Sequence, residues 1–150
     1  LICVAPDVGG VERTRALSRR INTEIAIIDK RRPTPGNSEV MNIVGIVKNK
    51  SCVIVDDIID SGGTIVNAAK ALKDKGAEDV YVYITHAVFS GKAVEKLEKS
   101  PVKKLITTDT IDNSKKIKMS KKIEVISIAP MMSEAIKRIS NSTSVSSLFK

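Results

Sequence analysis

Residues 53–64 constrain the fold of this chain more than any other stretch. Three β-branched apolar residues lead into two carboxylates, Asp56 and Asp57, and two further apolar residues lead into a third, Asp60. The segment Ser61-Gly62-Gly63-Thr64 follows and opens an amphipathic stretch. A short run that is entirely apolar is typical of a parallel strand covered on both faces. We therefore expect a buried strand that ends in the carboxylates, followed by a glycine turn and a helix.

The two glycines predict a phosphate site. They let the backbone bend so that successive N–H groups point at one centre, and the helix behind them adds its positive end. Ser61 and Thr64 add hydroxyl donors. The carboxylates repel phosphate, so we expect them to face sugar hydroxyls or a hydrated Mg²⁺. The pattern indicates a ribose 5-phosphate or phosphoribosyl pocket. The alternative is a solvated acidic turn before an ordinary helix. We disfavour it, because three acidic residues between a core strand and a glycine turn bring no structural benefit.

Apolar runs and amphipathic segments alternate along the chain, which predicts an α/β fold: a parallel sheet with helices on both faces. Segments 41–47 and 51–55 flank Lys48-Asn49-Lys50 and could pair as a hairpin. Met131 and Met132 are expected to fill the core. Further strands are expected at 1–4, 24–29, 79–85, 102–107 and 123–128, and helices at 11–21, 65–75, 91–99 and 131–139. The helix at 11–21 is expected to turn its arginines, Arg13, Arg15, Arg19 and Arg20, outward to solvent.

In such sheets, ligands bind at the carboxyl ends of the strands, and each remaining candidate follows a predicted strand. Asp7 is either a turn residue or a ligand-facing carboxylate. Lys30 and Arg32 belong to a loop rich in prolines and cations, which is either a solvated charge run or a lid over the phosphate site. His86 is either a general base or a loop histidine with a structural hydrogen bond, and we assign it no role.

Composition excludes several classes of protein. With 150 residues, 42% of them hydrophobic, the chain can bury the core of one domain. It has no apolar run of membrane-spanning length and no basic-then-apolar leader, so we expect a cytoplasmic protein without a membrane partner. The net charge is +8, but the cations are scattered and aromatics make up 3%, so we expect no nucleic-acid partner. Cys3 and Cys52 are expected to be buried thiols.

Several motifs resemble those of one family. They are Pro6-Asp7-Val8-Gly9-Gly10, the Asp-Lys-Arg-Arg-Pro of 29–33, the Val-Met-Asn-Ile-Val-Gly of 40–45, residues 85–91, Asp109-Thr110-Ile111 and the Ser-Val-Ser-Ser-Leu-Phe of 144–149. With the Asp-Asp-x-x-Asp segment, they resemble the ribose-phosphate pyrophosphokinases (PRPP synthases) over nearly the whole chain. The Asp-Asp-x-x-Asp segment alone also resembles the wider phosphoribosyltransferase-type (type I) fold.

The resemblance implies a transferase. ATP and ribose 5-phosphate would give AMP and phosphoribosyl pyrophosphate (PRPP), with Mg²⁺ as cofactor. Lys30 and Arg32 match the catalytic loop cations, and Asp7 matches a carboxylate associated with the metal. The positions that match the ribose 5-phosphate site are Asp56, Asp57, Asp60, Ser61, Gly62, Gly63 and Thr64.

The resemblance also implies a larger assembly, because family members form homo-hexamers. The chain begins at Leu1, inside a predicted strand and without an initiator Met. We therefore expect residues 1–150 to be the C-terminal, phosphoribosyltransferase-like domain of a longer two-domain polypeptide, incomplete for activity alone. Asp112, Ile46 and Glu12 depart from the family pattern outside the expected ribose site. Two alternatives stay open: a phosphoribosyltransferase, and a non-catalytic, regulatory homologue associated with PRPP synthase.

Overall fold

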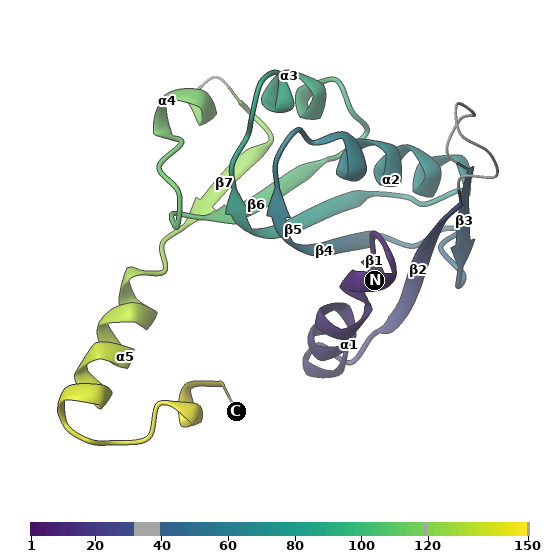
Figure 1. The fold of residues 1–150 in the computed structure, drawn as a ribbon. Coiled ribbons are helices and arrows are strands. Elements are labelled where there is room, and N and C mark those ends of the chain that lie inside the picture. Colours follow the sequence, from purple (N-terminus) through teal and green to yellow (C-terminus); the bar gives the residue numbers. More distant parts are fainter. Residues whose placement is uncertain (32–39, 119, 150) are drawn as a thin grey trace.

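The computed structural model describes residues 1–31, 40–118 and 120–149. These residues form a seven-stranded sheet of order β3-β2-β1-β4-β5-β6-β7 (Figure 1). All neighbouring strands are parallel except β2 and β3, which are antiparallel. The predicted α/β class is therefore confirmed, with one antiparallel edge strand. The strands are β1 (Ile2–Ala5), β2 (Glu24–Arg31), β3 (Val40–Val44), β4 (Cys52–Ile59), β5 (Val80–Ala87), β6 (Lys104–Thr108) and β7 (Ile123–Ile126).

The predicted hairpin between residues 41–47 and 51–55 is wrong. Strand β3 pairs with β2, with Ile43 opposite Ile28, and it forms the edge of the sheet. Strand β4 lies in the centre, where Cys52 is in register with Ile2 of β1 and Val80 of β5. The physical reason is burial: the first residues of β4 are apolar on both faces of the pleat, and a central position covers both faces.

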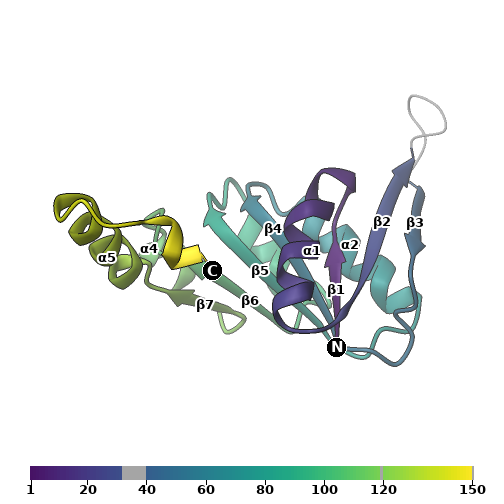
Figure 2. The ribbon, with the colours of Figure 1, turned by 90° about the horizontal axis from the view of Figure 1, so that it is seen from below.

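Helices cover both faces of the sheet, as predicted (Figure 2). Helix α1 (Val11–Arg20) contacts β1, β2 and β4, while α2 (Gly63–Asp74) contacts β3, β4 and β5 from the opposite face and also touches α3 (Ala93–Glu98). Between the sheet and the α2 layer lies a core that includes Ile54, Leu72, Val82, Phe89 and Leu97, all nearly inaccessible to solvent. This packing fixes the orientation of α2, whose first turn carries the candidate phosphate loop.

Glycines in the left-handed backbone region mark both ends of α2. Gly62, with φ of 76°, precedes the first helical residue, and Gly76, with φ of 84°, follows the last turn. The Gly76 N–H donates to the Lys73 carbonyl, which otherwise has no partner within the helix. The predicted helix at 65–75 therefore starts two residues earlier, within the glycine turn, and stops at the glycine.

The carboxy-terminal elements extend away from the sheet, beyond β7 (Figures 1 and 2). Helix α4 (Ser114–Ile117) precedes β7, and α5 (Ala129–Ser140) and the 3₁₀ turn η2 (Ser146–Phe149) follow it. No residue of α5 is buried. The prediction that Met131 and Met132 fill the core is wrong, since they are 48% and 47% exposed. Across the described residues, no helix has both the length and the apolar character needed to cross a membrane.

Candidate functional site

A cavity of about 240 Å³ lies at the carboxyl ends of β1 and β4. Because these strands are parallel neighbours, the segments that follow them meet at one edge of the sheet. The cavity brings Asp7, which follows β1, together with Asp56 and the turn that leads into α2. Its lining consists of Asp7, Asp56, Ile58, Ile59, Asp60, Ser61, Gly62, Gly63, Thr64 and Ile65. The expected ribose-site residues other than Asp57 therefore line one cavity.

The turn before α2 has the geometry of an anion site. Gly62 adopts φ of 76° and accepts the Val66 N–H at 3.0 Å, which sets the first turn of the helix. The N–H groups of Gly63, Thr64 and Ile65 belong to this first turn, where no helical carbonyl is in reach. They lie at the positive end of a 12-residue helix, beside the cavity. This arrangement suits a phosphate or another small anion.

Gly63 adds a second observation. It is the first helical residue of α2 and its φ is not positive. Apart from its chain neighbours and its own helix, the nearest described atom to an added Cβ would be Ser61 Oγ, at 3.9 Å. Neither the backbone nor the packing therefore requires glycine at this position, although alanine favours a helix more. A ligand that approaches the Gly63 backbone closely would require it.

The segment that follows β5 braces the turn from behind. The Val88 N–H donates to the Ile59 carbonyl at 2.9 Å, and the Ser90 N–H donates to the Asp60 carbonyl at 3.1 Å. Gly62 packs against Ala93 of α3, whose atoms lie 3.6 to 3.7 Å from the position of an added Cβ. The turn before α2 is thus held in place by backbone hydrogen bonds in the free protein, which lowers the entropic cost of binding a ligand.

Asp56 and Asp57 lie within β4, which runs on to Ile59. The expectation that the strand ends in these carboxylates is therefore wrong, because it continues for two residues beyond Asp57. The strand continues because β5 extends equally far, with Ile58 in register with His86. The Asp57 N–H donates to Asp56 Oδ1 at 3.0 Å. Burial raises the pKa of Asp56 above its ordinary value, and the Asp57 N–H and the Arg13 charge partly oppose this shift.

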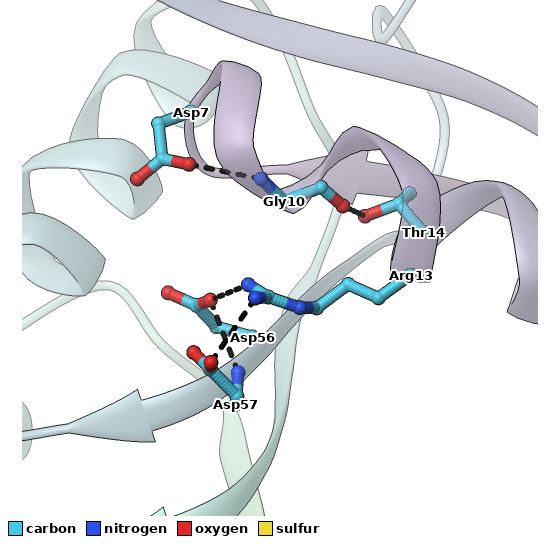
Figure 3. A network of polar contacts seen from close by, with 6 residues as sticks. All are labelled: Asp7, Gly10, Arg13, Thr14, Asp56 and Asp57. Carbon is cyan, nitrogen blue, oxygen red and sulfur yellow. Dashed lines mark hydrogen bonds and ion pairs between the residues drawn. The ribbon is translucent and has the colours of Figure 1, made fainter.

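Both carboxylates pair with Arg13 of α1 (Figure 3). Its Nη1 donates to Asp56 Oδ1, and its Nη2 donates to Asp57 Oδ2 at 3.1 Å. The sequence places Arg13 on the solvent face of a helix, and this expectation is wrong. Arg13 lies one turn after Gly10, at the end of α1 that adjoins the carboxyl end of the sheet. That position in the chain is the signal that could have identified it.

Asp7 has the structural role considered for it. Its Oδ1 accepts the Gly10 N–H at 3.0 Å and caps the 3₁₀ turn η1 (Val8–Gly10). Asp7 also lines the cavity, and its ligand-facing role stays a prediction. Among residues 1–31, 40–118 and 120–149, no cluster of three or more His, Cys, Asp or Glu side chains is arranged to hold a metal ion. A single carboxylate in the cavity, such as that of Asp7, is enough for a Mg²⁺ ion whose other ligands are water and substrate phosphates.

The remaining candidates lie elsewhere. Lys30 is half-buried near the end of β2, in register with Met41 of β3, and it does not line the cavity. Arg32 lies outside the described residues. His86 Nδ1 is 3.0 Å from Thr110 Oγ1, and Thr110 Oγ1 donates to the Thr85 carbonyl. This is the structural hydrogen bond considered for the histidine.

A second cavity, of about 300 Å³, adjoins the other side of Asp56. Its lining is mainly apolar and includes Leu17, Tyr83, Ile106 and Ile126. It carries no glycine turn and no helix start, so it offers no converging N–H groups to an anion. The cavity beside Gly62 and Gly63 is therefore the better candidate for a phosphate site.

Comparisons with known proteins agree with this geometry. A family model described as "Phosphoribosyl synthetase-associated domain" matches residues 9–150. A ribose-phosphate pyrophosphokinase of Hyphomonas neptunium is 53% identical over 99% of this chain, which spans 48% of that relative's length. The crystal structure of phosphoribosylpyrophosphate synthetase from Mycobacterium smegmatis aligns with a TM-score of 0.82 and 32% identity, over 94% of this chain and 45% of that one.

A likeness to purine phosphoribosyltransferase from Pyrococcus horikoshii is weaker. Its TM-score is 0.51 with 25% identity, over 60% of this chain and 64% of that one. The order of these similarities confirms the resemblance seen in the motifs and the phosphoribosyltransferase-type fold. This chain spans about half the length of the curated relatives it matches. The match over residues 9–150 shows that the chain belongs to the phosphoribosyl synthetase-associated domain family.

Proposed function

We propose that this chain binds ribose 5-phosphate as part of a ribose-phosphate pyrophosphokinase, which transfers the pyrophosphoryl group of ATP to the 1-hydroxyl of the sugar and yields PRPP and AMP. The observation that carries the proposal is the cavity itself. One wall is a glycine turn at a helix N-terminus, and another carries a carboxylate of β4, so the cavity offers separate partners for the phosphate and for the ribose hydroxyls. The names of its relatives agree with this reaction.

The residues divide the work by charge. Backbone N–H groups of residues 61–64, with the hydroxyls of Ser61 and Thr64, hold the 5-phosphate. Asp56, Asp57 and Asp60 accept hydrogen bonds from the ribose hydroxyls and thereby orient the attacking 1-hydroxyl. Phosphoryl transfer requires little covalent chemistry from the protein, so positioning and charge neutralisation account for most of the catalysis.

Charge on the pyrophosphoryl group needs cations. Mg²⁺, when bound, offsets charge on the phosphate oxygens, and Asp7 is the described carboxylate that would hold it. Lys30 and Arg32, which match the catalytic loop cations of the family motif, would stabilise the charge that develops during transfer. This assignment rests on the motif, because Lys30 does not line the cavity and Arg32 lies outside the described residues.

We infer that transfer also needs contributions from outside these 150 residues. The curated relatives are about twice as long, and the described cavity offers phosphate and sugar partners but no pocket for a nucleotide base. The chain would then act as the C-terminal, phosphoribosyltransferase-like domain of a larger enzyme, in a cytoplasmic homo-oligomer such as a hexamer. Alone, it should bind ribose 5-phosphate but release little AMP from ATP.

The phosphoribosyltransferase alternative is less well supported. The identity to a ribose-phosphate pyrophosphokinase is 53%, against 25% to a purine phosphoribosyltransferase. The non-catalytic alternative implies that the site residues are lost. The sequence nevertheless contains all of them: Lys30, Arg32, Asp56, Asp57 and Asp60.

Calorimetric titration tests the proposal. Ribose 5-phosphate should bind the folded chain at one site and more tightly than inorganic phosphate, because the sugar adds hydroxyl contacts. Ribose without phosphate should bind weakly, since it lacks the group that the glycine turn holds. The proposal fails if ribose 5-phosphate does not bind a chain that circular dichroism shows to be folded, or if ribose binds equally well.

A further inference from the structure

Arg13 joins two parts of the candidate site that are far apart in the sequence. It lies 43 residues before Asp56 and 44 before Asp57, and it reaches both from the first turns of α1 (Figure 3). Its guanidinium spreads over the pair, with Nη1 on one carboxylate and Nη2 on the other. Its Nη1 also lies 3.7 Å from the position of a Cβ added at Gly10, in the turn that Asp7 caps. Arg13 thus links the start of α1, next to the turn after β1, to the carboxylates of β4.

Arg13 offsets part of the negative charge at the cavity, because it pairs with Asp56 and Asp57. The cavity is lined by three carboxylates, those of Asp7, Asp56 and Asp60, and within the described part of the chain its lining contains no cation. Adjacent carboxylates repel one another and also repel a sugar phosphate. The Asp56 side chain is only 13% exposed, so water screens it poorly. A cation fixed between Asp56 and Asp57 keeps both charges close together without a ligand.

The ion pairs also select which carboxylate oxygens can reach a ligand. Arg13 contacts Asp56 Oδ1 and Asp57 Oδ2, so one oxygen of each carboxylate lies outside these pairs. A guanidinium is planar and presents its donors at fixed angles, so pairing with two carboxylates restrains the rotation of both. A lysine ammonium carries the same charge but acts as a point charge and imposes no such plane.

Anchoring of α1 does not depend on Arg13. Thr14 and Ser18 are the buried residues of this helix, and Leu17 is half-buried. Thr14 Oγ1 donates to the Gly10 carbonyl at 2.9 Å and holds the first turn. The Arg13 side chain is 36% exposed, more than a residue that anchors a helix by packing.

We propose that Arg13 is a positioning residue for sugar recognition: it holds Asp56 and Asp57 so that their remaining oxygens meet the ribose hydroxyls. The inference rests on the proposed function and deepens it, because it identifies what separates ribose 5-phosphate from phosphate alone at this site. Arg13 does not itself touch the 5-phosphate, which the glycine turn holds. Loss of Arg13 should therefore affect sugar contacts and spare phosphate contacts.

The test compares two ligands on four proteins, each the full 150-residue chain. The proteins are the wild type, Arg13→Gln, Arg13→Lys and the control Arg19→Gln. The control removes the same charge from an exposed position on the same helix. Calorimetry measures the affinity for ribose 5-phosphate and for inorganic phosphate, and thermal unfolding checks that each variant is folded. Arg13→Lys retains the charge and serves as the test if Arg13→Gln does not fold.

Arg13→Gln should lower the affinity for ribose 5-phosphate by about tenfold or more, which is the usual effect of losing a charged hydrogen bond. Its affinity for inorganic phosphate should fall much less, because Arg13 does not line the cavity and the glycine turn supplies the phosphate contacts, whereas any effect of charge alone acts on both ligands equally. Arg13→Lys should resemble Arg13→Gln, since it lacks the planar fork. Arg19→Gln should match the wild type with both ligands.

Three results with the Arg13 variants would overturn the inference. Equal losses for both ligands would make Arg13 a source of charge only. Recovery in Arg13→Lys would show that the fork is not needed. Unchanged ribose 5-phosphate affinity in both Arg13 variants would remove its role but leave the proposed function intact. If the wild type itself does not bind ribose 5-phosphate, the proposed function fails, and the inference fails with it.

Discussion

Replacing Gly63 with alanine separates the needs of the fold from those of the ligand. The residue has a helical backbone, and an added Cβ would meet no described atom closer than Ser61 Oγ, at 3.9 Å. The substitution therefore creates neither strain nor a clash in the free protein. Alanine favours a helix over glycine by up to about 1 kcal/mol. We expect Gly63→Ala to leave the stability unchanged or raise it by an amount within that limit.

The effect on binding should have the opposite sign. If the 5-phosphate sits against the Gly63 N–H, a methyl group beside that N–H lengthens or removes one charge-assisted hydrogen bond. Such a bond contributes about 1.5–3 kcal/mol, which corresponds to a loss of affinity of about 10- to 150-fold. A variant that is equally stable but binds ribose 5-phosphate and inorganic phosphate more weakly by this factor would assign the glycine to the ligand.

Urea unfolding and calorimetry measure the two quantities, with Gly76→Ala as the control. Gly76 lies at the far end of α2, about 18 Å along a helix of 12 residues. Its φ of 84° strains any other residue, and an added Cβ would lie 3.2 Å from Lys48 Cγ. Gly76→Ala should lose about 1–2 kcal/mol of stability and keep the affinity of the wild type.

Two results would refute this reasoning. Wild-type affinity in Gly63→Ala would show that no anion approaches this part of the backbone. A large loss of stability in Gly63→Ala would show that the fold needs the glycine, so that a loss of binding would reveal nothing about the ligand.

Three further predictions concern the core, the buried carboxylate and the loop. Leu72→Ala should cost about 2–5 kcal/mol in a urea unfolding experiment, because Leu72 is 0% exposed in the main core; a cost below 1 kcal/mol would contradict this packing. Burial raises the Asp56 pKa, so the protonated side chain favours the folded state, and this contribution to stability is lost as the pH rises through the pKa of the folded protein. The stability of Asp56→Asn relative to the wild type should therefore increase from acidic to neutral pH. A difference in stability that does not change with pH would contradict the shift. Lys30→Ala in a complete enzyme should lower kcat by about a hundredfold with little change in ribose 5-phosphate affinity, whereas wild-type turnover would make Lys30 a solvated surface charge.

The sequence predicts the parts of this fold that local chemistry determines. The apolar run of β4, the glycine turn and the end of α2 at Gly76 follow from residue types whose effects are confined to a few neighbours. The cavity follows as well, because parallel strands bring their carboxyl ends together. This is why the turn after β1 and the turn before α2 meet as expected.

The larger errors concern partners that lie far apart in the sequence. Segments 41–47 and 51–55 are separated by a turn-like tripeptide, but the edge position of β3 depends on β2 and the central position of β4 on β1 and β5. The sequence pattern predicts a solvent-facing Arg13, because a helical pattern shows which face is polar but not which carboxylates lie opposite it. The prediction that Met131 and Met132 fill the core is wrong for a related reason. Amphipathicity identifies an apolar face of α5 but does not determine what packs against it.

Amide chemical-shift mapping tests the central claim, that the turn before α2 holds the phosphate of ribose 5-phosphate. The ligand is titrated into isotopically labelled chain, and each backbone N–H signal is followed to saturation. The account predicts that the largest shifts fall on Ser61, Gly62, Gly63 and Thr64, with smaller shifts at Asp56 and Asp57. Saturating ribose 5-phosphate that leaves the signals of the four turn residues unmoved would contradict it.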